Sequence, residues 1–196
     1  GGKNERCTDQ RQCWPWGRKN QREQERNGYE PGIKDGRVWT KEGQGEWANK
    51  ANAREKASFL KENLLPMQES GQLHFIDRKG GHYLEKSELG FGIHFMDGHT
   101  DKQMLPHITY KGKSLVFVAD LIPTVGHIPL PYVMGYDTRP LLTLTEKETF
   151  LINAVENDWL LFFEHDAHNE ICSLQKTEKG ARLDTLFSFN ELFWAH

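Results

Sequence analysis

The chain has 196 residues, 37% of them hydrophobic, and carries a formal net charge of -3. This length suits one domain with a sizeable core, and six Trp with eleven Phe exclude a disordered chain. The charge differs from that of nucleic-acid-binding proteins, and no apolar run reaches the roughly 18 residues of a membrane span. We therefore expect a globular protein with neither a nucleic acid nor a membrane as partner.

The cysteines Cys7, Cys13 and Cys172 form an odd and sparse set. Free thiols in such a set are typical of a reducing compartment. Residues 1–30 are also too polar for a signal peptide. Together these features predict a cytoplasmic location.

Two regions differ in pattern along the chain. Residues 1–32 are charged, lack apolar periodicity and are predicted to be irregular, whereas residues 33–196 have the patterns of one folded domain. Strands are predicted at 37–40, 73–76, 92–97, 107–110, 114–120, 159–166 and 171–176. Helices are predicted at 53–64 after a capping box of Asn52 and Glu55, at 145–155 after one of Thr145 and Glu148, and near 189–194. Strands with helices between them indicate a layered α/β fold.

Three of the predicted strands end in potential metal ligands, His99, Asp120 and His165. In layered α/β folds, side chains from separate strand ends converge, and ligands collect there. Imidazole and carboxylate together suit zinc, iron or manganese better than calcium or magnesium. Spacing alone also allows ordinary loop or core histidines and an aspartate that caps a turn.

Three segments resemble motifs of the metallo-β-lactamase superfamily. GHTDKQMLPHI (98–108), LVFVADLIP (115–123) and LFFEHDAHNE (161–170) are similar to its third, fourth and fifth metal-binding motifs, in the family's order. The resemblance extends from about Tyr29 to the end and is strongest to lactonases and organophosphate hydrolases. Residues 127–151 are similar to the substrate-side loop and following helix of that branch. The resemblance implies an αββα sandwich, of which this chain supplies mainly the C-terminal half.

The resemblance also implies roles for the three strand-end residues. His99 matches a ligand of the first metal, Asp120 the carboxylate that bridges both metals, and His165 a ligand of the second. Two divalent cations, zinc by expectation with iron or manganese as alternatives, would polarise a carbonyl or phosphoryl group and hold a hydroxide nucleophile. The expected activity is cleavage of a small-molecule lactone, ester or phosphotriester. Pro123 stands where some lactonases have a tyrosine, which weakens an assignment to acyl-homoserine lactones.

One part of the family pattern is absent. The family's other ligands come from H-x-H-x-D-H, and this sequence contains no H-x-H. Gly1-Gly2 resembles the continuation of that motif, although a tag remnant would look the same. We expect the N-terminal half of the sandwich to be missing, the chain alone to be inactive or nearly so, and an uncovered sheet edge to favour a homodimer. The alternative is a non-catalytic fragment or interaction protein in which His99, Asp120 and His165 are unused.

Further residues are candidates for secondary or substrate contacts: His168, Asp166, His127, His107, Tyr132 and Tyr136. His168 is expected to be either a partner of His165 or a surface histidine. Asp166 would either orient His165 or cap the loop. Tyr132 and Tyr136 would either donate hydrogen bonds to a developing oxyanion or line an apolar pocket.

Overall fold

The computed structural model describes residues 37–41, 67–78 and 80–194 of the chain. The chain divides into two compact units, residues 1–76 and 77–196, and each is described here by itself. The predicted irregular segment at 1–32 and the predicted helix at 53–64 lie outside the described residues. Within the described ranges, no helix has the length and apolar content that a membrane span needs.

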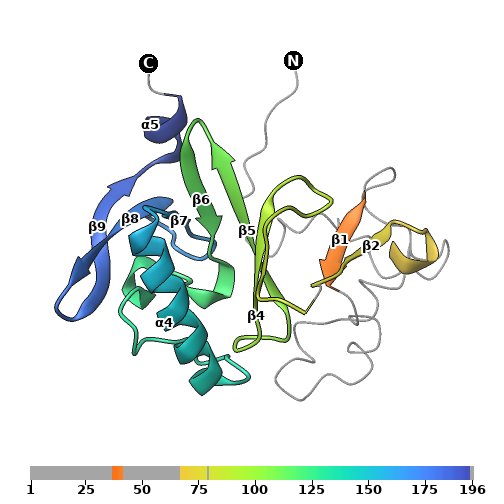
Figure 1. Cartoon of the computed structure of the whole chain (residues 1–196), viewed down its shortest axis with the longest axis horizontal. Coiled ribbons are helices and arrows are strands. Elements are labelled where there is room, and N and C mark those ends of the chain that lie inside the picture. Colours follow the sequence, from red (N-terminus) through yellow and green to blue (C-terminus); the bar gives the residue numbers. More distant parts are fainter. Residues whose placement is uncertain (1–36, 42–66, 79, 195–196) are drawn as a thin grey trace, which may run out of the picture. The chain divides into compact units, whose positions relative to one another are not determined.

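The first unit contains a small parallel sheet. Strand β1 (Val38–Lys41) pairs with β2 (Leu73–Ile76), and the two strands confirm the predictions at 37–40 and 73–76 (Figure 1). Trp39 and His74 are directly opposite each other in the register, and their rings stack with centroids 4.9 Å apart. This cross-strand ring pair stabilises the parallel register.

The second unit is built on a seven-stranded sheet with the strands in chain order. The strands are β3 (Tyr83–Leu84), β4 (Gly92–Met96), β5 (Gln103–Tyr110), β6 (Lys113–Phe117), β7 (Leu160–Phe162), β8 (Ile171–Thr177) and β9 (Gly180–Phe187). Only the β6–β7 pair is parallel among these described strands. Its crossover contains the short 3-10 helices η2 (Ala119–Leu121) and η3 (Val125–His127), followed by helix α4 (Pro140–Glu156); the short helix α5 (Phe189–Phe193) follows β9 (Figure 1).

Helix α4 begins earlier than the sequence pattern predicts. The helix starts at Pro140 with Arg139 as its N-cap, so the predicted capping box at Thr145 and Glu148 is wrong. Proline at the first helical position has its φ already set for a helix and needs no N–H partner. Thr145 instead lies inside the helix, where its hydroxyl donates to the carbonyl of Leu141 at 3.3 Å.

Several other predicted elements are confirmed, and two strands, the short β3 and the longer β9, were missed. The β5–β6 hairpin turns at Lys111 and Gly112, which both have positive φ, and the predicted helix near 189–194 is α5. Strand β9 was missed because Arg182 and Asp184 interrupt its apolar pattern. Its pairing with β8, rather than its own composition, makes it a strand.

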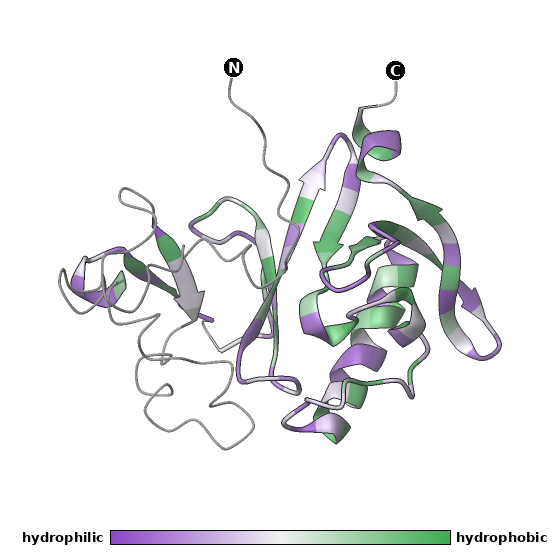
Figure 2. Ribbon diagram, turned by 180° about the vertical axis from the view of Figure 1, so that it is seen from behind, coloured by the Kyte–Doolittle hydropathy of each residue, from purple (hydrophilic) through white to green (hydrophobic). Residues whose placement is uncertain are grey.

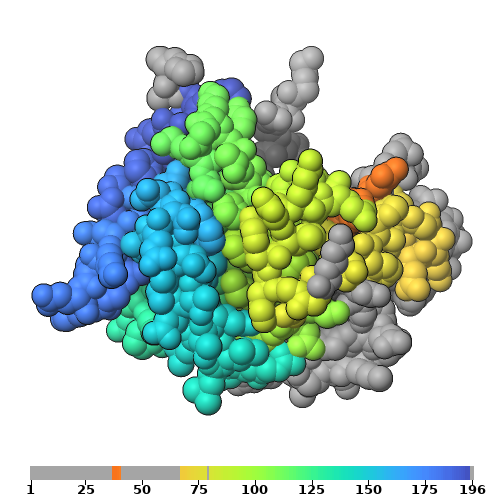
Figure 3. Space-filling view, viewed as in Figure 1, coloured from red at the N-terminus to blue at the C-terminus, as the bar shows by residue number. Residues whose placement is uncertain are grey.

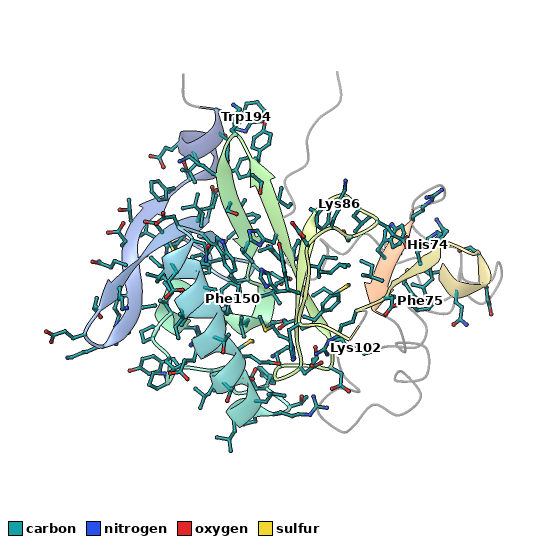
Figure 4. All side chains as sticks on the ribbon, viewed as in Figure 1. His74, Phe75, Lys86, Lys102, Phe150 and Trp194 are labelled. Carbon is teal, nitrogen blue, oxygen red and sulfur yellow. The ribbon has the colours of Figure 1, made fainter. Side chains whose placement is uncertain are left out.

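The main core lies between the sheet and α4. Phe150, Leu151 and Ala154 of the helix pack over Val116 and Leu161 of the central strands, all under 5% exposed (Figures 2 and 4). Burying a side chain of this size contributes roughly 1.5–3 kcal/mol to the free energy of unfolding. This packing fixes α4 against the strand ends that carry the candidate ligands.

The opposite face of the sheet has a second apolar cluster. Leu115, Leu160 and Ile171 pack there with Phe193 of α5. Strand β6 therefore buries Leu115 on one face and Val116 on the other, as its continuous apolar run predicts.

The cysteine prediction is confirmed where it can be described. Cys172 is a buried free thiol, and Cys7 and Cys13 lie outside the described residues. Burial, with a smaller contribution from the charge of Asp166, raises the pKa of the Cys172 thiol to about 12. The thiol is therefore protonated and unreactive at neutral pH.

Candidate metal centre

Asp120 owes its position to a sharp turn after β6. The N–H of Val118 still donates to Phe162 of the neighbouring strand at 3.0 Å, but Ala119 has φ = +41° and begins helix η2. A left-handed alanine costs roughly 1–2 kcal/mol. Such backbone strain is often found at functional sites.

His99 lies in the loop that follows β4, and α4 holds this loop closely. A Cβ added to Gly98 would lie 2.4 Å from the backbone nitrogen of Thr143, so only glycine fits there. The N–H groups of Thr138 and Arg139 donate to the carbonyls of His99 and Gly98 at 3.0 and 2.8 Å. The loop backbone around His99 is thus fixed by the start of the helix.

Glu146 of α4 adds a second attachment to the same loop. Its two carboxylate oxygens accept the N–H groups of Asp97 and Gly98 at 2.7 and 2.9 Å. Burial raises the pKa of Glu146, although these two hydrogen bonds act to lower it. No local sequence pattern predicted this contact, because Glu146 lies on a helix far along the chain from Asp97 and Gly98.

Asp137 fixes the ring of His99. Its Oδ1 lies 2.9 Å from Nδ1 of His99, and the Asp137 side chain is 1% exposed. An ionised carboxylate can only accept, so Nδ1 carries the proton of this hydrogen bond. Nε2, the other ring nitrogen, then faces Oδ2 of Asp120 at 3.3 Å. Burial alone would lower the pKa of His99, but the hydrogen bond to Asp137 and the charges of Asp120, Asp137 and Glu164 raise it overall.

His165 completes the group of three predicted ligands. It follows β7, and its Nε2 lies 2.9 Å from Oδ1 of Asp120. The Asp120 carboxylate therefore lies between two imidazoles, with one oxygen toward each. The structure thus brings together the three residues that the sequence singled out, in an arrangement that suits a bridging carboxylate.

Glu164 belongs to this group and was missed as a candidate. Asp120, Glu164 and His165 each offer a ligand atom within 4.8 Å of the others. Burial raises the pKa of Glu164, and the nearby charge of Asp120 adds to this effect against that of His165. Its position directly before His165 in the same motif was the available sequence signal.

Asp166 and His168 contribute to the loop. Asp166 accepts the N–H of Val125 at 3.0 Å through Oδ2, and those of His168 and Asn169 at 3.1 and 3.0 Å through Oδ1. These bonds match the loop-capping alternative for Asp166. His168 makes its contact through the backbone, and the residue is exposed, as a surface histidine would be.

The predicted substrate-side residues lie on the loop before α4. Nδ1 of His127 is 2.8 Å from the hydroxyl of Thr124, and burial lowers the pKa of His127, as does the charge of Lys147. Tyr132 and Tyr136 are 60% and 77% exposed. Their roles toward a substrate stay predictions.

Lys147, which the sequence did not indicate, holds this loop in place. Its ammonium group is fully buried and donates to the carbonyls of Pro129, Leu130 and Tyr132 at 3.0, 3.4 and 2.7 Å. Burial lowers the pKa of Lys147 to about 8, and the charge of Asp137 partly opposes this shift.

His107 lies elsewhere, where it is partly buried and paired with the buried His94. Its Nδ1 is 3.1 Å from Nε2 of His94, and its Nε2 is 2.7 Å from the hydroxyl of Ser114. Trp159 packs against both imidazoles. His107 therefore belongs to an aromatic cluster rather than to the candidate metal centre.

Two other features of the second unit are unlike a metal centre. His82, Asp97 and Glu146 also gather ligand atoms, but Arg78 already binds Asp97 at 2.6 Å and contacts His82 at 3.0 Å. A groove of about 340 Å³ between α4 and the β8–β9 hairpin is lined in part by Leu151, Val155 and Ala181, and contains none of the candidate ligands. Figure 3 shows α4 and this hairpin on the viewed face.

No family model and no curated protein sequence matches the chain. Solved structures do. A probable metal-dependent hydrolase from Staphylococcus aureus superimposes with a TM-score of 0.59 and 18% identity, over 76% of this chain and 50% of that one. The hydrolase AbOPH of the β-lactamase superfamily has a TM-score of 0.61 and 15% identity, over 81% of this chain and 57% of that one. The chain has a metallo-β-lactamase-type fold.

A further neighbour with this fold is AidC, a dizinc quorum-quenching lactonase solved with the product N-hexnoyl-L-homoserine. Its TM-score is 0.58 with 16% identity, over 78% of this chain and 55% of AidC. The chain thus spans 50–57% of the length of these three neighbours. In this fold His99, Asp120 and His165 follow strands β4, β6 and β7, and the Asp120 carboxylate lies between the two imidazoles.

Proposed function

We propose that this chain supplies part of the metal centre of a hydrolase that cleaves a small-molecule lactone, ester or phosphotriester. The observation that carries the proposal is the Asp120 carboxylate, which has one oxygen toward Nε2 of His99 and the other toward Nε2 of His165. Imidazole and carboxylate donors fit zinc, iron or manganese. AidC, which is named a dizinc lactonase, has the same type of fold and supports this assignment.

Each residue has a distinct task in the proposed centre. His99 and His165 would offer Nε2 as ligand atoms, and Asp120 would offer its carboxylate oxygens to the divalent cations. Bound cations of this kind polarise a carbonyl or phosphoryl group and activate a water molecule as nucleophile. Asp137 holds the His99 ring in the tautomer that leaves Nε2 available, as carboxylates commonly do beside histidine ligands.

The sequence lacks the H-x-H-x-D-H motif, from which the family takes its remaining ligands. We therefore propose that the 196-residue chain alone has little or no hydrolase activity. Assays of lactone, aryl ester and phosphotriester hydrolysis with added Zn²⁺ test this part. Robust turnover by the purified chain would contradict it. The cytoplasmic location and the homodimer also stay predictions.

Metal binding tests the centre itself. We expect the chain to bind at least one equivalent of Zn²⁺, and His165→Ala or Asp120→Ala to weaken binding at least tenfold. His168→Ala is the matched control, because it removes an exposed imidazole from the same loop. Less than one equivalent bound to the wild-type chain would favour the non-catalytic alternative.

A further inference from the structure

We propose that Glu164 is an additional metal ligand, so that Glu164, His165 and Asp120 together hold one divalent cation without any residue outside this chain. The proposal deepens the proposed function, because it rests on the same metal centre. Oε2 of Glu164 lies 4.0 Å from Nε2 of His165, and a ligand atom of Asp120 is within 4.8 Å of both side chains. Neither the sequence motifs nor the bridging arrangement assigns a task to Glu164.

The charges around Glu164 support a cation at this position. Two carboxylates, those of Asp120 and Glu164, share one small region, and like charges there are unfavourable without a compensating cation. Among the described residues, their ion-pair partners are only the imidazoles of His99 and His165. The cluster of His82, Asp97 and Glu146 differs, since the guanidinium of Arg78 supplies its positive charge.

The donor geometry is also suitable for one cation. Zinc sites in enzymes commonly use three protein ligands, from histidine and carboxylate groups, and leave a fourth position open. Metal–ligand distances near 2.0–2.2 Å require the ligand atoms to approach more closely than 4.0 Å. Both Glu164 and His165 have side chains that are 44% exposed, so they have room for this small adjustment. His99 would keep its contact with Oδ2, the other oxygen of Asp120.

Isothermal titration of the 196-residue chain with Zn²⁺ tests this assignment. Glu164→Gln should weaken Zn²⁺ binding at least tenfold, because it removes a charged ligand at nearly constant size. Glu178→Gln is the matched control: it removes the same charge from the exposed β8–β9 turn and should bind like the wild type. With Co²⁺ as the probe, the visible absorption of the bound ion should also change in Glu164→Gln and not in the control.

Thermal unfolding separates a ligand from a residue with a structural role. Without metal, Glu164→Gln should unfold at the wild-type temperature or above it, since the repulsion from Asp120 is reduced. With Zn²⁺, its stabilisation should be smaller than that of the wild type. A lower unfolding temperature of the metal-free variant together with wild-type Zn²⁺ affinity would overturn the proposal.

The variants also distinguish this proposal from the proposed function. Wild-type Zn²⁺ binding by Glu164→Gln, with weak binding by His165→Ala and Asp120→Ala, would remove Glu164 from the centre and leave the proposed metal centre in place. Wild-type binding by all three variants would overturn both.

Discussion

His94 of β4 and His99 of the loop that follows it are close in sequence but have opposite surroundings. His94 is 8% exposed and stacks on Tyr83, with ring centroids 4.4 Å apart, while Trp159 packs beside it. His99 is also partly buried, yet it hydrogen bonds to the carboxylate of Asp137. Burial, followed by the charge of His107, lowers the pKa of His94 to about 4, whereas the pKa of His99 is raised.

This difference shows what determines the chemistry of a histidine in this sheet. Desolvation disfavours the imidazolium in both places, and only a nearby carboxylate reverses its effect. An imidazole surrounded by rings is kept neutral and serves packing. An imidazole that lies between carboxylates binds a cation more readily, either a proton or a metal ion.

Acidification should produce the largest effect, at His94. Its pKa is lower in the folded state than the ordinary 6.5, so the folded state favours the neutral imidazole. The contribution of neutral His94 to the free energy of unfolding is therefore fully present above pH 6.5 and is lost as pH falls toward 4. A shift to about 4 corresponds to roughly 3 kcal/mol in the free energy of unfolding. Urea unfolding between pH 7 and pH 4 measures this loss. His94→Gln should flatten the pH dependence and His168→Gln should not; equal curves for the two variants would contradict the prediction.

Asp137→Asn should make His99 behave more like His94. Loss of the carboxylate should lower the pKa of His99, which an NMR titration of the imidazole measures. Zn²⁺ affinity should fall roughly 10- to 100-fold, because the ring is no longer held by a charged partner. Asp184→Asn, which alters an exposed carboxylate bonded to Ser173, is the control. An unchanged pKa of His99 would show that Asp137 does not set its charge.

Gly98→Ala tests whether close packing against α4 keeps His99 beside Asp137. The added methyl group would meet the backbone of Thr143, so we expect a loss of roughly 1–3 kcal/mol in the free energy of unfolding. Gly135→Ala is the control, since a Cβ there meets nothing within 4 Å. Equal stability of the two variants in urea unfolding would mean that the loop and helix separate easily.

Ala119→Gly should have the smallest effect, and it should stabilise. Glycine removes the strain of the left-handed φ of +41°, which should raise the free energy of unfolding by roughly 1–2 kcal/mol. The greater conformational freedom of glycine in the unfolded chain should offset about half of this gain. We expect a net gain below about 1 kcal/mol in urea unfolding. Ala167→Gly, in the loop beside His165, should instead lower the free energy of unfolding by about a few tenths of a kcal/mol. A destabilised Ala119→Gly would mean that the turn before Asp120 is unstrained.

Some neighbours of the candidate site could not be predicted from local patterns. Asp137 lies in a loop without periodicity, and Glu146 and Lys147 look like the exposed face of an amphipathic helix. Their contacts depend on how α4 packs on the sheet, which places Glu146 on the loop of His99 and Lys147 on three carbonyls. A local pattern carries no information about contacts between such distant segments.

The sequence by itself singled out His99, Asp120 and His165, because each follows an apolar run and their motifs resemble those of the metallo-β-lactamase superfamily. That the three side chains meet depends on the tertiary structure, in which β4, β6 and β7 run in the same direction and end at one edge of the sheet. Only the tertiary structure decided which histidine is paired with carboxylates and which is surrounded by rings. The β4–β5 register brings His94 to His107, and the packing of α4 brings Asp137 to His99. The pKa of an imidazole depends on those partners and on its burial, and both arise only when the chain is folded.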